Sequence, residues 1–492
     1  MPTIKKILIA NRGEIACRIL RTLDRMAIPG AVVCHAVDKF SPAVRMAAEA
    51  VEIDGPTPVA AYLDVEQIID ACRQTGADAV HPGFGFLAEN AGFAKRLSEE
   101  GITFIGPLPE TIELMGNKVA ARTFCIDNDF PLAPSVTEAD AGEDFAGQAG
   151  DIGVPLLIKA AAGGGGKGMQ IVEELEDLAQ AIQLAKGEAQ RAFGNGEVYA
   201  ERYVERPRHI EVQVIADHHG NVVHLGEREC SIQRRFQKII EESPAPGLDP
   251  DLRARICATA VEISRKTGYR NAGTVEFILA PDGEFYFLEM NTRLQVEHPV
   301  TEMVTGLDLV EMQIRVARGE TLPLTQGQVQ VDGHAIELRL YAEDPQNDFL
   351  PDTGPLLTYR MPSGDAVRVE NGFCEGMTVS SAFDPMLAKL IVHGKDRGQA
   401  IERGLKALKD TLVLGVTTNA DYLTRILSHP AYASGRIHTG FIPKHAASLS
   451  PPPLGEAERN LLLAAAALSN REFTDPAFNV PEPYTFIGNW RN

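Results

Sequence analysis

The sequence predicts a protein of mixed α/β and α+β fold, built from several packed domains. The chain has 492 residues, 44% hydrophobic and 23% charged, which is too long for one hydrophobic core and too apolar for a disordered chain. Before Lys118, short β-rich runs alternate with helical stretches, which indicates βαβ units and a parallel sheet. Beyond residue 200, several strands follow one another directly, which is typical of an antiparallel sheet with hairpins.

Composition and charge exclude several classes of function. The formal net charge is −20, from 47 Lys and Arg against 67 Asp and Glu, so the molecule as a whole would repel a nucleic acid or an anionic membrane surface. No stretch approaches the roughly 20 apolar residues that cross a bilayer. The seven cysteines have no CxxC spacing, which argues against a disulfide framework or a zinc–thiolate site. We therefore expect a cytoplasmic protein that binds neither nucleic acid nor membrane.

The first part of the chain, residues 1–116, is predicted to be the parallel-sheet domain. Strands are expected in IKKILIAN (4–11), AVVCHAV (31–37), DAVHPG (78–83) and ITFIG (102–106), and helices in RGEIACRILRTLDRM (12–26) and YLDVEQIIDACRQTG (62–76). The turn after the first strand is Asn11-Arg12-Gly13 instead of G-x-G-x-x-G. A dinucleotide-binding Rossmann domain is therefore disfavoured.

The pattern changes after residue 116, and three further units are predicted. They are a body (117–332) that contains a segment of roughly 135–204 with a glycine-rich loop, a third domain (333–446), and a tail (447–492) with an alanine-rich helix at 461–468. Strands are expected in VPLLIKA (154–160), HIEVQVIAD (209–217), NVVHLGERE (221–229), GTVEFILA (273–280) and EFYFLEMN (284–291).

The segment 273–291 is predicted to form a hairpin that gathers oxygen ligands. Asp282-Gly283 between two alternating runs is a strong signal for a two-residue turn, and this turn places Glu276 directly opposite Glu289. In that register the side chains that share the face of Glu276 are Phe285, Phe287, Glu289 and Asn291. Like charges in this position repel, and Mg²⁺ or Mn²⁺ would cancel the repulsion. An exposed sheet face with two solvated glutamates is the alternative.

A glycine run, Gly163–Gly166, follows the strand that ends near Lys159. Successive glycines let backbone N–H groups close over a phosphate, and neighbouring lysines add charge. The run is not a P-loop, because Gly168 follows Lys167 where Ser or Thr would be needed. We expect a mobile flap over a nucleotide, with a plain flexible turn as the alternative. Lys118 is a further basic candidate.

Polar side chains are dense in two later segments and in a strand of the third domain. They alternate or cluster as a site for a small oxyanion would, because arginine offers a planar fork to carboxylate-like shapes. The residues are Lys238, Arg293, Gln295, Glu297 and Arg339. A solvated charged loop is the competing interpretation.

Together these motifs resemble those of the biotin carboxylase family of ATP-grasp enzymes. The segments that carry the resemblance over roughly residues 4–446 are ILIANRGEIACRI, HPGFGFLAEN, FIGP, LMGNKVAAR, GGGGKGM, ERYVERPRHIEVQV, CSIQRRFQK, EMNTRLQVEHPVTE and ELRLYAEDP. The resemblance implies an N-terminal biotin carboxylase α/β domain (1–116), an ATP-grasp body (117–332) with a mobile lid (135–204), and a C-terminal biotin carboxylase domain (333–446).

The resemblance also implies a reaction, that of an ATP-dependent C–N ligase. In this family ATP and bicarbonate form carboxyphosphate, which gives CO₂ and phosphate. The phosphate takes the N1′ proton of biotin, and the resulting enolate attacks CO₂. The sequence has no A-M-K-M biotinylation motif, so biotin is expected on a separate carrier or as free biotin. The implied partners are a biotin carboxyl carrier protein, carboxyltransferase subunits of an acyl-CoA carboxylase-type complex such as acetyl-CoA carboxylase, and a second copy in a homodimer. The tail is similar to the stretch after the carboxylase domain in acyl-CoA carboxylase α subunits, and a disordered tail is the alternative.

Roles for individual residues follow from the same resemblance. Glu276, Glu289 and Asn291 match the ligands of two Mg²⁺ or Mn²⁺ ions. The ATP-binding positions are Lys118, Lys159, Gly163, Gly164, Gly165, Gly166, Glu201, Val204, His209, Gln233 and Ile278. Glu297 matches the base that deprotonates bicarbonate, and Arg339 the group that stabilises the biotin enolate. Lys238, Arg293, Gln295 and the Val296 backbone would surround bicarbonate.

Three positions depart from the family pattern. Phe236 stands where the family has His in Q-R-R-H-Q-K, Phe84 stands where Tyr is usual beside biotin, and Ala162 shortens the glycine run. Phenylalanine neither donates a hydrogen bond nor carries charge. Two alternatives therefore stay open: a catalytically lapsed structural or regulatory paralogue, and another carboxylating ATP-grasp ligase. The acyl acceptor is not determined by these residues, because a carboxyltransferase selects it.

Overall fold

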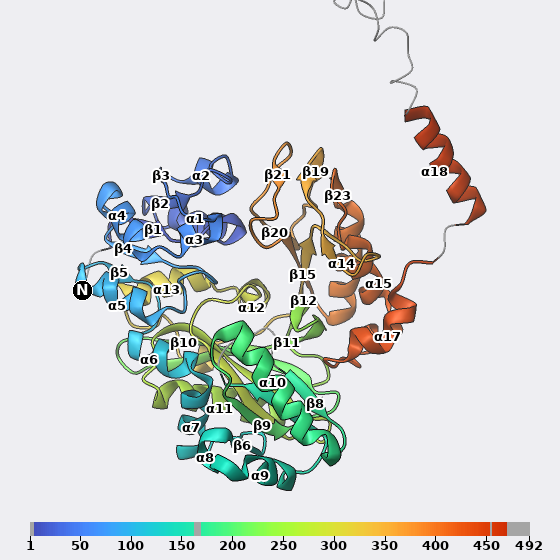
Figure 1. Cartoon of the computed structure of the whole chain (residues 1–492). Coiled ribbons are helices and arrows are strands. Elements are labelled where there is room, and N and C mark those ends of the chain that lie inside the picture. Colours follow the sequence, from blue (N-terminus) through green and yellow to red (C-terminus); the bar gives the residue numbers. More distant parts are fainter. Residues whose placement is uncertain (1–3, 162–168, 453–454, 470–492) are drawn as a thin grey trace, which may run out of the picture. The chain divides into compact units, whose positions relative to one another are not determined.

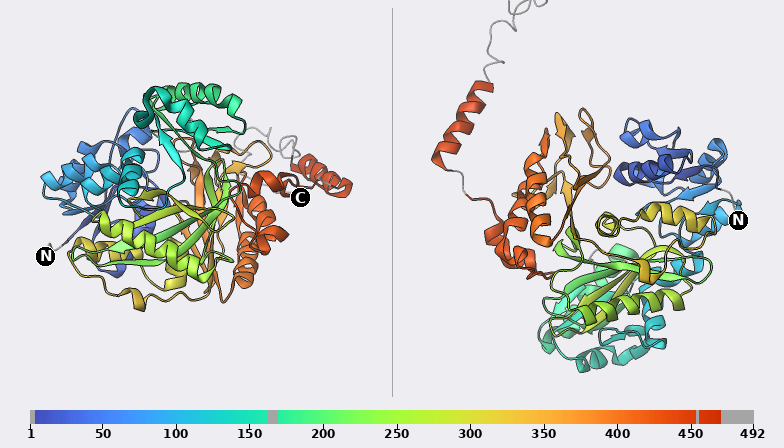
Figure 2. Two further views of the ribbon diagram at one scale, coloured as in Figure 1. Left: turned by 90° about the horizontal axis from the view of Figure 1, so that it is seen from below. Right: turned by 180° about the vertical axis from the view of Figure 1, so that it is seen from behind.

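The computed structural model describes residues 4–161, 169–452 and 455–469. The chain divides into two compact units, Met1–Ala446 and Ala447–Asn492. The first unit contains three sheets that matter for function, and Figures 1 and 2 show them from three directions. Each is described in turn.

The N-terminal part forms a five-stranded parallel sheet in the order β3-β2-β1-β4-β5. The strands are β1 (Ile7–Ile9), β2 (Gly30–Cys34), β3 (Glu49–Glu52), β4 (Ala79–His81) and β5 (Thr103–Phe104), and the helices are α1 (Gly13–Arg25), α2 (Pro42–Met46), α3 (Pro58–Tyr62), α4 (Val65–Thr75), α5 (Ala91–Glu99) and α6 (Pro109–Gly116). The predicted parallel-sheet domain is confirmed.

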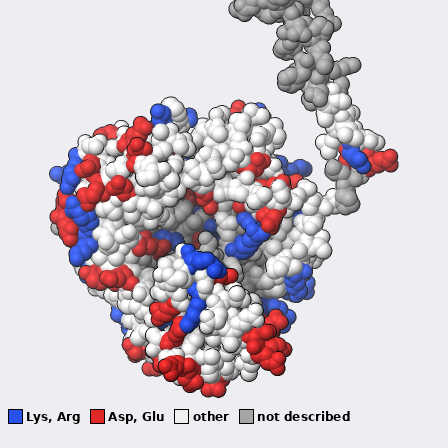
Figure 3. All heavy atoms as spheres, in the orientation of Figure 1, with Lys and Arg blue, Asp and Glu red and all other residues white. Residues whose placement is uncertain are grey.

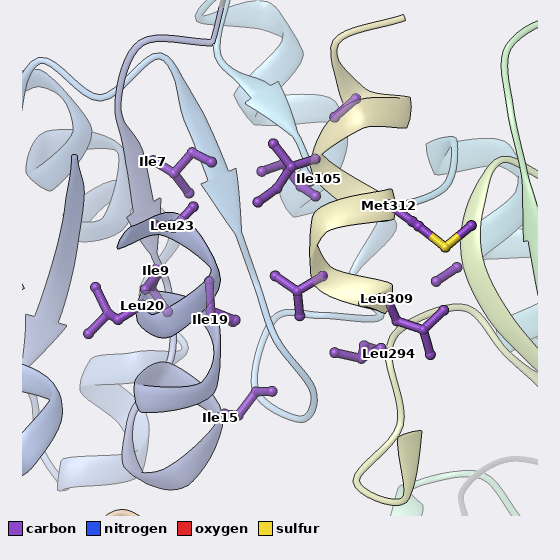
Figure 4. Close-up of a cluster of buried hydrophobic side chains, with 14 of the residues drawn as sticks. Ile7, Ile9, Ile15, Ile19, Leu20, Leu23, Ile105, Leu294, Leu309 and Met312 are labelled. Carbon is purple, nitrogen blue, oxygen red and sulfur yellow. The ribbon is translucent and has the colours of Figure 1, made fainter. Parts of the chain in front are cut away.

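The spacing of apolar residues in α1 explains which face of the sheet it covers. Ile15, Ile19 and Leu23 recur every four residues, so they form one stripe on the helix. This stripe packs in a buried cluster with Leu309 and Met312 of α13 (Leu309–Ala317), as Figure 4 shows. Helices α4 and α5 contribute to a second buried cluster together with the alternate residues of the same strands. The sheet is therefore covered on both faces, as a parallel sheet requires.

The centre of the molecule is an eight-stranded sheet in the order β14-β13-β10-β11-β12-β15-β22-β20, with antiparallel neighbours. Its strands are β10 (Arg208–Ala216), β11 (Val222–Arg234), β12 (Gln237–Ser243), β13 (Asn271–Leu279), β14 (Phe285–Asn291), β15 (His334–Tyr341), β20 (Val367–Asn371) and β22 (Met386–Gly394). The predicted antiparallel sheet is confirmed. It continues from the body into the third domain, because β12 pairs with β15.

Several helices border this sheet. Those nearest the residues predicted to form the site are α7 (Lys118–Asp127), α11 (Pro250–Lys266), α12 (His298–Thr305) and α13. Helices α7 and α11 pack in one apolar cluster with the inward residues of β10, β13 and β14. Helix α12 lies on β11, β12, β15 and β22, so the residues that precede it are held close to the middle of the sheet.

The hairpin β13–β14 corrects the predicted turn but confirms the predicted pair of glutamates. The loop has three residues, 281–283, because the Ala280 N–H donates to the carbonyl of Glu284 and the Ala280 carbonyl accepts from the Gly283 N–H. Gly283 adopts a φ of +90°. The register then shifts between Glu276 and Phe277, which leaves one extra residue on β14 and returns Glu276 to a position opposite Glu289.

The same bulge overturns the predicted placement of two aromatic residues. Phe287 lies opposite Phe277, and Phe285 contacts the Phe277 ring at a centroid distance of 5.6 Å. Both belong to the apolar cluster on the opposite face from Glu276. The extra residue reverses the alternation along β14, which a uniform two-residue period could not anticipate.

A separate four-stranded antiparallel sheet, in the order β6-β9-β7-β8, lies within the residues predicted as a lid. Its elements are β6 (Ser135–Thr137), α8 (Glu138–Ala141), η1 (Gly142–Asp144), α9 (Phe145–Asp151), β7 (Leu156–Ala160), β8 (Met169–Val172), η2 (Leu175–Asp177), α10 (Leu178–Phe193) and β9 (Val198–Arg202). It has an apolar core of its own. The predicted glycine loop, Gly163–Gly166, falls between β7 and β8 and lies outside the described residues.

The remaining elements complete the C-terminal part. They are η3 (Gln326–Gln328), β16 (Glu343–Asp344), β17 (Leu350–Pro351), β18 (Gly354–Pro355), β19 (Thr358–Arg360), β21 (Thr378–Val379), α14 (Arg397–Asp410), β23 (Leu412–Leu414), α15 (Ala420–Ser428), α16 (Pro430–Ala433), α17 (Phe441–Leu449) and α18 (Glu456–Ser469). Helix α18 contains the predicted helix 461–468. Among the described residues, no helix combines the length and apolar character that a membrane span needs.

Candidate active site

The ammonium of Lys238 is the centre of a buried polar network. Lys238 lies on β12, next to the turn that joins it to β11, and its Nζ donates to three carboxylates: Glu211 at 2.6 Å, Glu276 at 2.9 Å and Glu297 at 2.6 Å. Burial alone would lower the pKa of Lys238, but the three carboxylates raise it well above its usual value. The ammonium is therefore charged, and it holds together three separate segments of the chain.

Glu211 and Arg228, which the sequence interpretation did not single out, support Lys238 from within the sheet. Both side chains are fully buried, and the Arg228 Nε donates to Glu211. The other guanidinium nitrogens reach Gln213 at 2.8 Å and Gln295 at 2.8 Å. A signal was present in the sequence, because polar residues alternate along β10 and so mark one polar face of a strand.

Glu276 is the most heavily bonded carboxylate of the network. Its Oε1 accepts from Asn291 at 2.8 Å and Gln295 at 2.6 Å, besides Lys238. Its Oε2 lies 2.6 Å from Nε2 of His209. Burial would raise the pKa of Glu276, but the charges of Lys238 and His209 lower it well below its usual value. Glu276 is thus ionised.

Glu289, directly opposite Glu276, has the contrary electrostatic environment. Burial, together with the nearby charge of Glu276, raises its pKa. Glu289 has no ion pair with any residue in the described part of the chain. The two facing carboxylates therefore carry an unrelieved repulsion, and a divalent cation with oxygen ligands is the group that removes it. The predicted ligand set Glu276, Glu289 and Asn291 fits such a cation on this observation.

Two other groups of acidic and metal-binding side chains lie in the same network. They are His209, Glu211 and Glu276, and Glu211, Cys230 and Glu297, all buried. Both groups include Glu211, whose oxygens already accept from Arg228 and Lys238. Glu276 is likewise engaged by Lys238, Asn291 and Gln295, whereas Glu289 forms no ion pair among the described residues. Glu289 is therefore the carboxylate of this network that is left open to a cation.

Glu297 lies between two cations at the start of α12. Its Oε1 accepts from Lys238 and its Oε2 from Arg339 at 3.0 Å, and Arg339 also pairs with Glu241 at 2.5 Å. Burial would raise the pKa of Glu297, but Lys238 and Arg339 lower it far below its usual value. A carboxylate held between two such donors is charged at neutral pH, and it is a weak base for as long as both cations hold it.

Arg293 extends the network toward the N-terminal domain. Its guanidinium donates to Asn291 Oδ1 at 2.9 Å and to Glu89 Oε2 at 2.7 Å. Glu89 also accepts from the Thr292 N–H at 3.2 Å. The start of the loop between β14 and α12 is thereby fixed, and Glu89 joins the residues that the sequence interpretation missed.

A cleft of about 890 Å³ adjoins this network and reaches the four-stranded sheet. Lys118 and Glu289 line it, together with Ala161 and Glu197 near that sheet. Lys159 of β7 forms an ion pair with Glu201 of β9, so these two predicted ATP-binding residues meet each other but belong to the four-stranded sheet. Figure 3 shows a hollow in this face of the molecule with Lys and Arg side chains beside it, although the protein as a whole is acidic.

The other predicted positions are distributed around this centre. Gln233 Nε2 lies 2.8 Å from His209 Nδ1, and Ile278 is paired with His209 across β10 and β13. Val204 follows β9 and is half-buried. Phe236 is 62% exposed on the β11–β12 turn, and the Lys389 ammonium lies 5.9 Å from the centre of the Phe84 ring. The functional roles of all these residues stay predictions.

Three family profiles match the chain and agree with this geometry. They are the biotin carboxylase N-terminal domain at residues 3–112, the ATP-binding domain of the carbamoyl-phosphate synthase L chain at 117–325, and the biotin carboxylase C-terminal domain at 337–444. A buried network of cations and carboxylates beside a cleft, in a domain of the ATP-binding type, defines an ATP-dependent ligase.

Relatives and solved structures narrow the class. The chain is 47% identical over 442 residues to a biotin carboxylase of Halalkalibacterium halodurans, covering 90% of this chain and 98% of that one. It is 46% identical over 492 residues to the mitochondrial methylcrotonoyl-CoA carboxylase subunit alpha of Dictyostelium discoideum, covering 99% of this chain and 70% of that one. The same subunit of Mus musculus is 46% identical, and the chain spans 66% of its length. The chain belongs to the biotin carboxylase family.

Two crystal structures share the fold. The biotin carboxylase domain dimer of Hydrogenobacter thermophilus 2-oxoglutarate carboxylase, in complex with MgADP, ADP and bicarbonate, has a TM-score of 0.88 and 41% identity, covering 92% of this chain and all (100%) of that one. A complex of Campylobacter jejuni biotin carboxylase with β-γ-ATP has a TM-score of 0.87 and 42% identity, covering 90% and 99%. The predicted fold class is confirmed.

Proposed function

We propose that this chain carboxylates biotin on a separate carrier protein, with ATP and bicarbonate as co-substrates. The observation that carries the proposal is the placement of Glu297, the residue expected to act as base, between the Lys238 ammonium and the Arg339 guanidinium. Fixed cations around a small space stabilise negative charge as it develops, which is the largest contribution in reactions of this kind.

Bicarbonate would bind among Lys238, Arg293, Gln295 and the N–H of Val296. The anion would compete with Glu297 for the charge of Lys238, because that ammonium already serves three carboxylates. Losing part of this interaction raises the pKa of Glu297 toward the range in which it takes the bicarbonate proton. A bicarbonate oxygen then attacks the γ-phosphorus, ADP leaves, and the product is carboxyphosphate.

The nucleotide would lie in the cleft that adjoins the network around Lys238 and reaches the four-stranded sheet. Its candidate contacts are Lys118, Lys159, Gly163, Gly164, Gly165, Gly166, Glu201, Val204, His209, Gln233 and Ile278. Glu276, Glu289 and Asn291 would hold two Mg²⁺ or Mn²⁺ ions, which supply charge neutralisation for the phosphates when bound. Support comes from the raised pKa of Glu289 and from its place in the cleft beside Lys118.

Biotin would be activated next to Arg339. Carboxyphosphate gives CO₂ and phosphate, the phosphate takes the N1′ proton, and Arg339 stabilises the enolate that attacks CO₂. Arg339 is suited to this role because it is buried, charged and already paired with the proposed base. A charge that appears only after carboxyphosphate has formed calls for a group that is positioned in advance.

The proposed partners are a biotin carboxyl carrier protein, carboxyltransferase subunits and a second copy of this chain. They are supported by relatives that are named as carboxylase subunits and by a neighbour that is a dimer. The acyl acceptor would be selected by the carboxyltransferase.

Release of ADP, measured with and without bicarbonate and with and without free biotin, tests the proposal. Wild type should hydrolyse ATP only with bicarbonate, and free biotin should stimulate the rate. Arg339→Ser should keep the Michaelis constants for ATP and bicarbonate within a few-fold and lose the stimulation by biotin.

The alternatives predict other results. A lapsed paralogue would show no bicarbonate-dependent hydrolysis in wild type. A different carboxylating ligase would show hydrolysis that depends on an acceptor other than biotin. Biotin stimulation that survives in Arg339→Ser would reject the role of Arg339 while leaving the reaction in place.

A further inference from the structure

Lys389 is a fully buried lysine that contacts residues 292–297, the loop between β14 and α12 that is proposed to bind bicarbonate. It lies on β22, its side chain is 0% exposed, and its Nζ donates to the carbonyl of Val296 at 2.7 Å. The same nitrogen lies 3.0 Å from Oε1 of Glu14, in the first turn of α1. Three distant segments of the chain therefore meet at this ammonium.

The carbonyl of Val296 belongs to the peptide that links Val296 to Glu297. The preceding carbonyl, of Gln295, lies 2.7 Å from Nδ1 of the buried His298. A carbonyl only accepts, so Nδ1 carries the proton. Both peptides that flank Val296 are thus anchored through their carbonyl oxygens. Their anchors set the direction of the Val296 N–H and of the Glu297 side chain.

A positive charge at position 389 destabilises the folded state unless it is neutralised. Lys389 lies directly opposite Arg339 on β15, and like charges opposite each other repel. Taking an ammonium out of water also costs several kcal/mol unless it is paired. Glu14 offsets both effects by neutralising Lys389, while Arg339 is neutralised by Glu241 and Glu297. A methionine of similar length would avoid the cost, but it could not hold the carbonyl.

We propose that Lys389, neutralised by Glu14, is a positioning residue for bicarbonate: it fixes the Val296–Glu297 peptide, so that the base Glu297, which follows it, faces the anion. The inference rests on the proposed function, and it adds a residue of the third domain and one of the N-terminal domain to the bicarbonate site. Neither side chain forms a hydrogen bond or an ion pair with Lys238, Arg293 or Gln295, so both act through the peptide.

Lys389→Met tests the proposal, with Arg397→Met as the matched control. Arg397 is also a mostly buried cation of the third domain, bonded to Glu242 at 2.6 Å and 3.0 Å. Its loss likewise removes a cation from a buried carboxylate, which keeps His334 as a partner, and it does not involve the loop. For Lys389→Met we expect kcat/KM for bicarbonate to fall about 10-fold to 100-fold, the worth of one bond to a charged donor. The KM for ATP should stay within about twofold in both variants.

Hydrogen–deuterium exchange supplies a readout that does not depend on turnover. Amides of residues 292–305 should exchange faster in Lys389→Met than in wild type, and at the wild-type rate in Arg397→Met. If Lys389→Met fails to fold, Glu14→Gln/Lys389→Met replaces it, because that double variant removes the charge of Glu14 together with that of its ion-pair partner.

An unchanged kcat/KM for bicarbonate in a folded variant, or a change equal to that of Arg397→Met, would overturn the inference. So would an unchanged exchange rate in the loop. A wild type without bicarbonate-dependent hydrolysis contradicts the proposed function itself, and the exchange measurement then still decides whether Lys389 positions the loop.

Discussion

Two buried clusters of charge in this molecule differ in how completely their charges are matched. The first, the site network, consists of Glu211, Arg228, Lys238, Glu276, Glu289, Glu297 and Arg339. The second, the hinge cluster, consists of Arg18, Glu302, Asp308, Arg368 and Glu370, and it joins α1, α12, α13 and β20. Both lie among segments that are far apart in the sequence.

In the hinge cluster every carboxylate has a guanidinium partner. Arg18 reaches Glu302 at 2.7 Å and Asp308 at 2.9 Å, and Arg368 reaches Glu302 at 2.8 Å and Glu370 at 2.7 Å. Burial would raise the pKa of Glu302, but Arg18 and Arg368 lower it. In the site network, by contrast, Glu289 keeps a raised pKa beside Glu276. A fully matched cluster stabilises the fold, whereas an unmatched charge in a cleft indicates a ligand that completes it.

The largest effect is expected for Glu289→Gln. The substitution removes one charge from the proposed cation site without changing side-chain volume. Bicarbonate-dependent ATP turnover should fall by about 1,000-fold or more, since a bound metal is worth several kcal/mol of charge stabilisation. Steady-state kinetics at ordinary Mg²⁺ checks this.

The thermal stability of the metal-free variant, unlike its turnover, should not fall. Because Glu289 is buried beside Glu276, Glu289→Gln without metal should melt at the same temperature as wild type or higher, and Mg²⁺ should stabilise it less than wild type. Near-normal turnover, or equal stabilisation by Mg²⁺, would refute the cation assignment.

The same substitution in the hinge cluster, Glu302→Gln, should do the reverse. Glu302 accepts from Arg18, Arg368 and the Leu309 N–H. Losing its charge removes one carboxylate from each of two guanidinium groups, which keep only Asp308 and Glu370 as partners. We expect the free energy of unfolding to fall by about 3 to 5 kcal/mol at pH 7, with kcat of the folded enzyme within about twofold of wild type.

The pH dependence gives a second test of Glu302. Its pKa is lowered in the folded state, so its contribution to stability is present above the unfolded value of 4.5 and is lost as the pH falls below it. The difference between wild type and Glu302→Gln should therefore shrink from pH 7 to pH 4 in urea unfolding. A variant that unfolds like wild type but has lost its activity would show that the two clusters do not differ in kind.

Most of the fold could be predicted from the sequence, because it is encoded in short-range patterns. The alternation of apolar strands and helices up to residue 106 predicts the parallel sheet, and the alternating runs after residue 200 predict the antiparallel one. The turn at Asp282-Gly283 was predicted one residue too short. The bulge after Phe287 compensates for this, so the Glu276–Glu289 pair was predicted correctly, but the Phe285 and Phe287 face was not.

The site was predictable only where a motif carries it. Lys238 and Glu297 stand in segments that resemble family motifs, and Glu276 stands in the predicted hairpin. The structure brings both carboxylates within hydrogen-bond distance of the Lys238 ammonium. Arg228 and Lys389 belong to no such motif, because their function lies in contacts between segments far apart in the chain. The continuity of one sheet across residue 332 was likewise invisible, since strand pairing between β12 and β15 leaves no local signature.

The smallest effect is expected for Phe236→His. This substitution also tests one of the departures from the family pattern. Phe236 and Arg235 form the turn between β11 and β12 with φ values of 66° and 50°, which is strained for a bulky side chain. Histidine and asparagine tolerate positive φ better, so Phe236→His and the control Phe236→Asn should each be as stable as wild type or slightly more stable, by about 0.5 kcal/mol. Both side chains can donate a hydrogen bond to ATP phosphates, but only the imidazole can also carry a positive charge. Because position 236 is 62% exposed, solvent weakens a bond from the imidazole to the phosphates. The KM for ATP should therefore change by no more than about 10-fold, below the range of a buried charged bond.

A change of that size in Phe236→His but not in Phe236→Asn means that the phenylalanine tunes an active enzyme. Equal kinetics in all three proteins would mean that the turn does not reach the nucleotide, and hydrolysis found only in Phe236→His would mean that the wild-type chain has lapsed.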